Sequence, residues 1–175
     1  MPMVFKNSRL LLLSAVILLG ACNSDQKSTR RVTKDMLLEM NRQMVSAESR
    51  VIEQYIADHE LDMKKSSTGY YYRVSTPAKG DTIKPRDVVT LAYTTRLLDG
   101  TVCYSSATEG MMTFTVGKAQ VEAGLEQFVQ QLGQGAIGQI IMPPYLAHGI
   151  AGDGDKIPRL AILMMDIEVL KVQRP

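Results

Sequence analysis

Side chains that commonly carry chemistry are few and scattered in this sequence. Cys103, His59 and His148 lie far apart, without further cysteines or carboxylates at the spacings of a zinc site. No histidine forms a recognisable catalytic pattern with Cys103, which we interpret as a small packing residue rather than a nucleophile. Asp153 and Asp155 alternate with glycine but lack the full ligand spacing of a calcium loop. We therefore expect no metal ion and no cofactor.

A string punctuated by proline and glycine near the C-terminus is more informative. It runs from Pro143-Pro144 through His148-Gly149 and Ile157-Pro158 to a closing strand that ends at Leu170. This string resembles the end of an FKBP-type prolyl isomerase domain. Upstream residues match in family order and at nearly family spacing: Val88-Val89, Tyr93, Leu98-Asp99-Gly100, Ser105-Ser106, Phe114, Val116-Gly117-Lys118, Gln120-Val121, Gly124-Leu125 and Gly133 to Gly138.

The resemblance implies that the protein accelerates cis–trans isomerisation of Xaa-Pro bonds. Partial double-bond character gives such a bond a barrier near ~20 kcal/mol, and its spontaneous turnover is slow. Because no bond is broken, a catalyst needs an apolar, aromatic-lined slot that grips the proline ring and excludes water. The slot must also donate hydrogen bonds to the carbonyl of the twisted amide, which it binds better than the planar one.

The resemblance also assigns site residues, position by position. The backbone N–H of Glu122 is the expected donor to substrate. The residues implied as catalytic are Tyr93, Val121, Glu122, His148 and Ile157. The residues implied to complete the substrate pocket are Cys103, Tyr104, Met112, Phe114, Leu125 and Met165.

Several of these positions depart from the family pattern. Cys103-Tyr104 stand where the family usually has phenylalanine and aspartate, and Leu125 replaces the tryptophan of the pocket floor. His148 replaces a tyrosine, and is either a substitute hydrogen-bond donor or a plain loop histidine. Met165 replaces a late phenylalanine. A floor without the flat indole should grip proline less well, so a non-catalytic chaperone or interaction module is the alternative to an isomerase.

The amino terminus predicts a compartment. Basic residues precede an apolar run from Leu10 to Leu19, which is too short to span a bilayer and indicates a signal peptide over residues 1–21. Small residues before Cys22 resemble a bacterial lipoprotein signal, in which this thiol is acylated; the alternative is an ordinary secretory signal. Asn23 favours the outer membrane. We expect a lipid-anchored protein of the cell envelope.

Net charge and cysteine content argue against nucleic-acid binding and against an intramolecular disulfide. The formal net charge of +2 falls to zero when Lys6 and Arg9 leave with the signal. A neutral chain lacks the clustered basic residues on which nucleic-acid binding rests. With Cys22 acylated, Cys103 stands alone and no intramolecular disulfide can form.

A helical segment is expected between a polar tether, residues 22–32, and the isomerase-like domain. Apolar residues recur at spacings of three and four after the helix cap Thr33, at Leu37, Met40, Met44, Ala47, Val51 and Tyr55. This pattern predicts an amphipathic helix to about His59, within a segment that covers residues 33–65. The stripe suits either a dimer seam or packing on the chain's own domain, and we favour local packing or weak self-association through residues 33–59. A third functional hypothesis makes this helix the binding element of a scaffold.

Residues 66–175 alternate as an antiparallel sheet does. The pattern predicts an edge strand over 70–74, a long central strand over 88–98, another strand over 111–116, and a hairpin turn at Asp99-Gly100. In the last strand one face carries Ala161, Leu163, Met165, Ile167 and Val169.

One short helix should cover this sheet. Leu125, Phe128, Val129 and Leu132 share a helical face, and Gly133 can end the helix in a left-handed conformation. We predict an α+β fold in which a curved antiparallel sheet wraps around one short helix, as the FKBP resemblance also implies. The whole is most similar to prolyl isomerase-like lipoproteins associated with gliding motility, and its expected partners are proline-containing client proteins and the membrane.

Overall fold

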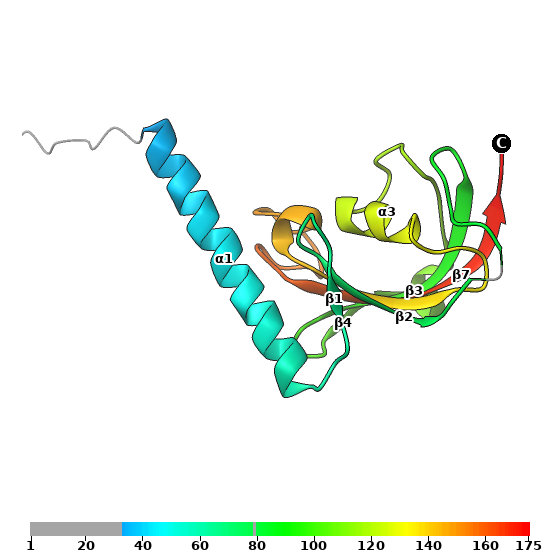
Figure 1. Cartoon of the computed structure of the whole chain (residues 1–175), viewed down its shortest axis with the longest axis horizontal. Helices are drawn as coiled ribbons and strands as arrows, with labels where there is room; N and C mark the ends of the chain where they lie inside the picture. The colour runs from blue at the N-terminus through cyan, green and yellow to red at the C-terminus, as the bar shows by residue number, and fades with distance from the viewer. Residues whose placement is uncertain (1–32, 79) are drawn as a thin grey trace, which may run out of the picture. The chain divides into compact units, whose positions relative to one another are not determined.

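The computed structural model describes residues 33–78 and 80–175, so the predicted signal, Cys22 and the tether lie outside the described residues. The elements, shown in Figure 1, follow in chain order: α1 (Lys34–Asp58), β1 (Lys64–Lys65), β2 (Tyr71–Thr76), β3 (Val88–Leu97), β4 (Val102–Ser105), α2 (Ser106–Glu109), β5 (Met112–Thr115), α3 (Ala123–Val129), β6 (Ile137–Met142), the 3-10 helix η1 (Pro144–Leu146) and β7 (Leu163–Gln173). None of the described helices is both long and apolar enough to cross a bilayer.

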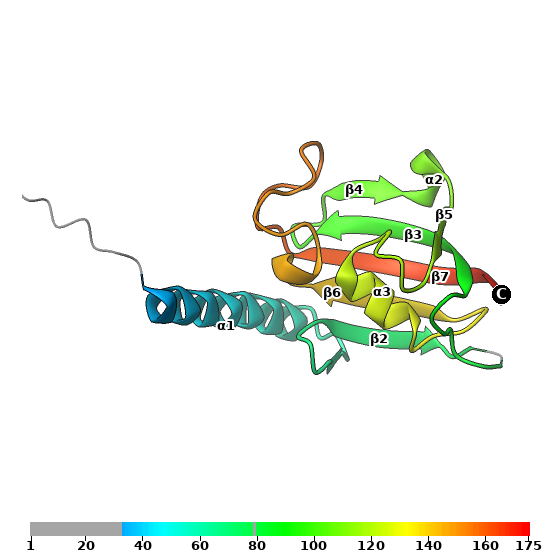
Figure 2. The same cartoon turned by 90° about the horizontal axis from the view of Figure 1, so that it is seen from above.

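The strands form one antiparallel sheet in the order β1-β2-β6-β7-β3-β4, with β5 also paired to β3. The longest ladder joins β3 to β7, from Val88 opposite Gln173 to Leu97 opposite Leu163. The sheet curves, and α3 lies against its concave face (Figures 1 and 2). The predicted α+β architecture is therefore confirmed.

The main core lies between α3 and the sheet. Leu125, Phe128 and Val129 of α3 are fully buried, and each such side chain contributes roughly 1.5–3 kcal/mol on removal from water. The helix approaches closely because β6 has a glycine beneath it. A Cβ atom on Gly138 would lie 2.8 Å from Cζ of Phe128, so a larger residue there would push α3 away from the sheet.

A smaller cluster covers the other face of the sheet. The chain divides into two compact units after Leu37, and the larger unit contains the rest of α1. Within that unit Ile52 of α1 is fully buried against Tyr71, Ile141 and Met164. Met164 alternates along β7 with the residues that face α3, which puts this cluster on the opposite side.

The predicted amphipathic helix exists as α1, but its packing face differs from the prediction. Leu37, Met40 and Val51 of the predicted stripe are 56%, 57% and 53% exposed. These three residues therefore do not pack locally, whereas Tyr55 of the same stripe packs against the cluster around Ile52. The buried residue is Ile52, one position later, and one residue rotates an α-helix by about 100°.

The end of α3 also differs from the prediction. The helix stops at Val129, and Gly133 does not have the expected positive φ, which occurs instead at Gly135 with φ 82°. Gly133 is needed for a close approach: a Cβ there would lie 2.7 Å from the carbonyl oxygen of Asp81. Its lack of a side chain serves packing rather than a left-handed turn.

The sheet contains strands beyond those predicted. Lys64–Lys65 form β1, just before the predicted domain start, and pair with β2, so β2 is not the outermost strand. Strand β4 pairs with β3 across the predicted Asp99-Gly100 hairpin turn, although its bounds were not predicted, and β6 was not predicted at all. In β6 both Ile140 and Ile141 are fully buried, on opposite faces, so the strand lacks the alternation that marks a half-exposed one.

Candidate active site

Most of the predicted site residues belong to the main core or pack against it. Buried in the main core are Cys103, Phe114, Leu125, Ile157 and Met165. Partly buried and packed against the same core are Tyr93, Tyr104, Met112 and Val121. These residues come from β3, β4, β5, α3, β7 and the connecting loops, and we refer to the region around them as the slot.

A surface hollow of about 600 Å³ opens beside this cluster. Its lining comprises Met112, Thr113, Phe114, Ala119, Gln120, Val121, Glu122, Ala147 and His148. Five of the predicted residues are on that lining, among them Glu122 and His148. The other six predicted residues do not line this hollow.

The floor is closed in this structure. Leu125 and Met165 each have no exposed surface. They therefore support the slot from beneath, as packing residues of the core.

One wall is held by a network of hydrogen bonds around Asp153. The hydroxyl of Tyr104 donates to Oδ2 of Asp153 at 2.5 Å. Oδ1 of Asp153 accepts the backbone N–H groups of Asp155 and Ile157 at 2.9 and 2.8 Å. The loop between η1 and β7 is thus fixed from β4, and with it the position of Ile157.

The protonation states of Asp153 and Tyr104 follow from the same hydrogen bonds. The hydrogen bond from Tyr104, with those from two backbone N–H groups, lowers the pKa of Asp153 to about 2. The same hydrogen bond to Asp153 raises the pKa of Tyr104 to about 12. Nζ of Lys156 lies 4.6 Å from the centre of the Tyr104 ring and 3.1 Å from a carboxylate oxygen of Glu109. Tyr104 therefore remains a neutral donor and Asp153 a charged acceptor at neutral pH.

Cys103 behaves as a packing residue in this wall. It is a buried free thiol, and its Sγ lies 3.6 Å from the carbonyl oxygen of Lys156. Burial, followed by the charge of Asp153, raises the pKa of the thiol. A cysteine kept protonated is a poor nucleophile, which agrees with the interpretation from sequence.

The opposite end of the slot presents hydrogen-bond donors. Among the described residues the N–H of Glu122 has no acceptor, since Glu122 is the N-terminal flank of α3. The carboxylate of Glu122 reaches His148, with 3.1 Å between Oε1 and Nε2. Burial and the nearby charges of Glu109 and Glu122 raise the pKa of Tyr93, so its hydroxyl also stays protonated.

Three supporting residues were not assigned from the sequence. Ser106 accepts the N–H of Tyr93 and donates to its carbonyl oxygen, at 3.1 and 3.3 Å. Gln120 accepts the N–H of Thr115 at 2.8 Å and so anchors the turn before Val121. Asp153 had a readable signal, because aspartate before glycine often accepts the N–H two residues on.

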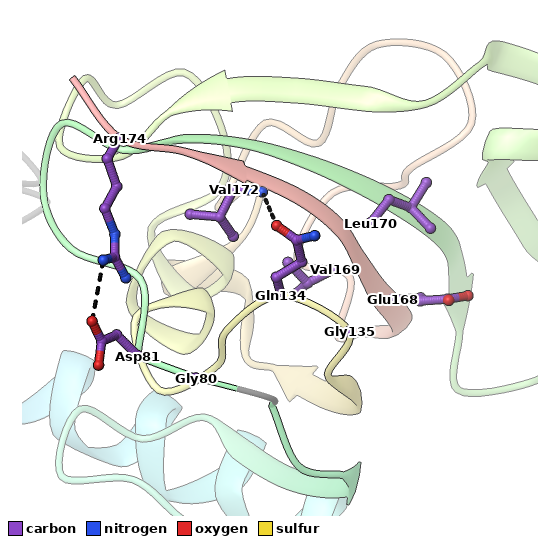
Figure 3. Close-up of a pocket in the computed structure, with 9 residues that line it drawn as sticks. All are labelled: Gly80, Asp81, Gln134, Gly135, Glu168, Val169, Leu170, Val172 and Arg174. Carbon is purple, nitrogen blue, oxygen red and sulfur yellow. Dashed lines mark hydrogen bonds and ion pairs between the residues drawn. The ribbon is translucent and has the colours of Figure 1, made fainter.

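A second hollow, of about 750 Å³, lies elsewhere and is shown in Figure 3. Asp81 and Arg174 form an ion pair across it at 3.1 Å, and the side chain of Gln134 accepts the N–H of Val172. None of the predicted site residues lines it. We therefore place the candidate site at the slot.

Comparison with known proteins decides the family. The profile of the FKBP-type peptidyl-prolyl cis-trans isomerase domain matches residues 79–170, which include every residue of the slot. This chain belongs to the FKBP-type peptidyl-prolyl cis-trans isomerase family. The match covers more than half of the 175 residues.

Individual FKBP-type relatives agree. A probable FKBP-type isomerase of Haemophilus influenzae is 36% identical over 112 residues, which are 63% of this chain and 46% of the relative. The probable isomerase FkpA of Neisseria meningitidis is 35% identical over 114 residues, or 65% of this chain and 41% of the relative. The chain thus spans less than half the length of these relatives.

A solved FKBP-type structure is also similar. The crystal structure of FkpA from Escherichia coli superposes with a TM-score of 0.65 and 29% identity, over 82% of this chain and 67% of that one. The altered positions Cys103, Tyr104, Leu125, His148 and Met165 therefore sit within an intact family fold.

Proposed function

We propose that this protein is a peptidyl-prolyl cis–trans isomerase that assists protein folding in the bacterial cell envelope. The observation that carries the proposal is a hollow lined by the apolar side chains of Met112, Phe114 and Val121, beside the N–H of Glu122, which has no acceptor among the described residues. Family membership supports the same reaction.

The geometry suits rotation about an amide. Apolar side chains remove water from the proline ring, and the planar amide, which is the more dipolar form, loses more on leaving water than the twisted one. The N–H of Glu122 can then donate to a substrate carbonyl. Binding the twisted amide better than the planar amide lowers the barrier without covalent chemistry.

A non-catalytic chaperone or interaction module is the second candidate. Its support is the floor, where Leu125 and Met165 replace aromatic family residues and are fully buried. A groove of this kind would hold apolar segments without gripping proline specifically.

Refolding kinetics separate the two candidates. The substrate is a protein whose slow refolding phase is limited by prolyl isomerisation, a step of about 10–100 s at 25 °C. Residues 23–175, added at far below the substrate concentration, should speed this phase if the protein is an isomerase. A rate that is unchanged, or slowed only at stoichiometric amounts, would support the holding module.

We further propose that Cys22 carries a lipid that anchors the protein at the outer membrane. The support is the sequence alone, through the apolar run of residues 10–19 and the small residues before the cysteine. Mass spectrometry of the protein from bacterial membranes should find an acylated Cys22. A Cys22→Ser variant should leave the membrane fraction, and retention of that variant would contradict the anchor.

Client binding and self-association also remain proposals. Proline-containing segments of envelope proteins are the proposed clients. Met40, Met44 and Val51 expose an apolar face on α1 that supports weak dimerisation. Sedimentation of a Met40→Gln, Val51→Gln double variant should show fewer dimers than the unaltered chain, and an unchanged distribution would count against the contact.

A further inference from the structure

Glu122 and His148 meet at the donor end of the slot although 26 residues separate them in the sequence. Oε1 of Glu122 lies 3.1 Å from Nε2 of His148, and the side chains are 15% and 31% exposed. Both residues line the hollow of about 600 Å³. The pair is therefore placed where a bound Xaa-Pro segment would contact it.

The chemistry of the pair restricts what His148 can offer. An ionised carboxylate only accepts hydrogen bonds, so the bond to Glu122 requires a hydrogen on Nε2 of His148. A neutral imidazole carries one hydrogen, which leaves Nδ1 as an acceptor. A charged imidazolium carries two, so Nδ1 becomes a donor while Nε2 stays bound to Glu122.

Other charged groups face this pair from several elements. The charge of Asp153, in the loop between η1 and β7, acts on His148. Tyr93 of β3 is close enough to Glu122, Glu109 and Lys156 to feel their charges. Lys156 is itself paired with Glu109 at 3.1 Å. His148 is therefore hydrogen-bonded to the carboxylate of Glu122 and also feels the charge of Asp153.

We propose that Glu122 is a positioning residue that makes His148 a pH-dependent hydrogen-bond donor to the substrate carbonyl. This inference rests on the proposed isomerase function. Histidine changes charge between about pH 5 and 8, so isomerisation is fastest on the acid side of that range. Below the titration His148 donates through Nδ1, and above it only the N–H of Glu122 and other fixed donors remain.

The pH dependence of kcat/KM for an Xaa-Pro peptide without titrating groups tests the inference. Residues 23–175 should give a kcat/KM about tenfold higher at pH 5.5 than at pH 8.5, the size of one charge-assisted hydrogen bond. In the same samples, 15N shifts of the His148 ring should show hydrogen on Nε2 in the neutral form. The pH midpoints of ring and activity should coincide.

Two variants test the roles of His148 and Glu122, and a third, at His59, is the control. His148→Tyr restores a donor that does not titrate in this range, so its profile should be flat. Glu122→Gln keeps the backbone N–H but removes the carboxylate, so the activity ratio between pH 5.5 and 8.5 should fall below about threefold. His59→Gln alters the other histidine, which stacks on Tyr55 of α1, and should keep the wild-type profile.

The outcomes separate this inference from the proposed function. Acceleration with a flat wild-type profile, or hydrogen on Nδ1 of neutral His148, overturns the role of the pair and leaves the isomerase intact. A Glu122→Gln profile equal to wild type also overturns it. No acceleration at any pH, with dispersed amide spectra, defeats the proposed function itself.

Discussion

The two ends of the slot hold their polar groups in different ways. At the wall, Tyr104 and Asp153 bond to each other, and Asp153 also accepts the N–H of Ile157. At the donor end, Glu122 and His148 are partly exposed, and the N–H of Glu122 has no acceptor among the described residues. A closed network fixes apolar side chains, whereas an open one leaves donors for a substrate. In this wall the loop itself supplies the carboxylate, Asp153, to which Tyr104 donates.

Removing the side chain that the wall positions should have the largest effect. Ile157→Ala deletes apolar contact with the proline ring, so kcat/KM should fall by about 10- to 100-fold. Ile157 is also buried, so the free energy of unfolding should fall by about 2–4 kcal/mol. Peptide kinetics and urea denaturation measure the two effects. Ile157→Val is the matched control and should keep most of the activity; an equal loss in both variants would refute a size-dependent grip.

Removing the carboxylate of Asp153 while Ile157 is kept should lower kcat/KM by less than Ile157→Ala does. Asp153→Ala leaves Tyr104 and two N–H groups without their acceptor, and the displaced loop should lower kcat/KM by about tenfold. Asp153→Asn retains an acceptor and should lose less. Amide hydrogen exchange at Ile157 should accelerate in the alanine variant. Slow exchange combined with lost activity would show that Asp153 acts on the substrate rather than through the loop.

Removing only the donor of the network should have a smaller effect still. Tyr104→Phe keeps the ring beside Lys156 but cannot donate to Asp153, which retains both backbone N–H groups. We expect kcat/KM to fall by about two- to fivefold. Steady-state kinetics suffice here, with Tyr145→Phe, whose hydroxyl donates to Thr68 outside the slot, as the control. A loss as large as that of Asp153→Ala would place Tyr104 itself in contact with substrate.

The smallest expected effect is the pH dependence of folding stability that arises from the wall. The folded pKa of Asp153, about 2, lies below the usual value for aspartate. Its stabilising contribution is therefore present above about pH 4 and is lost as pH falls toward 2. The pKa of Tyr104, about 12, preserves its donor until pH rises well above 10. Acid titration followed by circular dichroism should show Asp153→Asn losing less stability below pH 4 than wild type, and equal losses would count against the network.

The sequence predicted the layers of the fold better than the polar contacts between them. Leu163, Met165 and Ile167 alternate clearly, and Leu125, Phe128 and Val129 follow a helical period, so both layers of the fold could be predicted. Strand β6 was not predicted, because Ile140 and Ile141 are buried on opposite faces of the sheet and the sequence therefore shows no alternation. In α1 apolar residues lie on more than one face of the helix, at Val51 and at Ile52 for example. Only the tertiary contacts of Ile52 decide which of these faces is buried.

The polar contacts of the slot were beyond sequence reasoning for a physical reason. Tyr104 and Asp153 are 49 residues apart, and Glu122 and His148 are 26 apart. Such pairs depend on the path of the loop between η1 and β7, which has no periodic pattern. The family resemblance assigned Tyr104, Glu122 and His148 to the site, but it could not show which residues bond to each other.

The central claim is that this slot catalyses prolyl isomerisation, and NMR exchange on an Xaa-Pro peptide series tests it most directly. The exchange rate should rise in proportion to the concentration of residues 23–175, and Tyr93→Ala should reduce that slope at least fivefold. A zero slope for every peptide, from a protein whose amide spectrum shows the folded sheet, would contradict the claim.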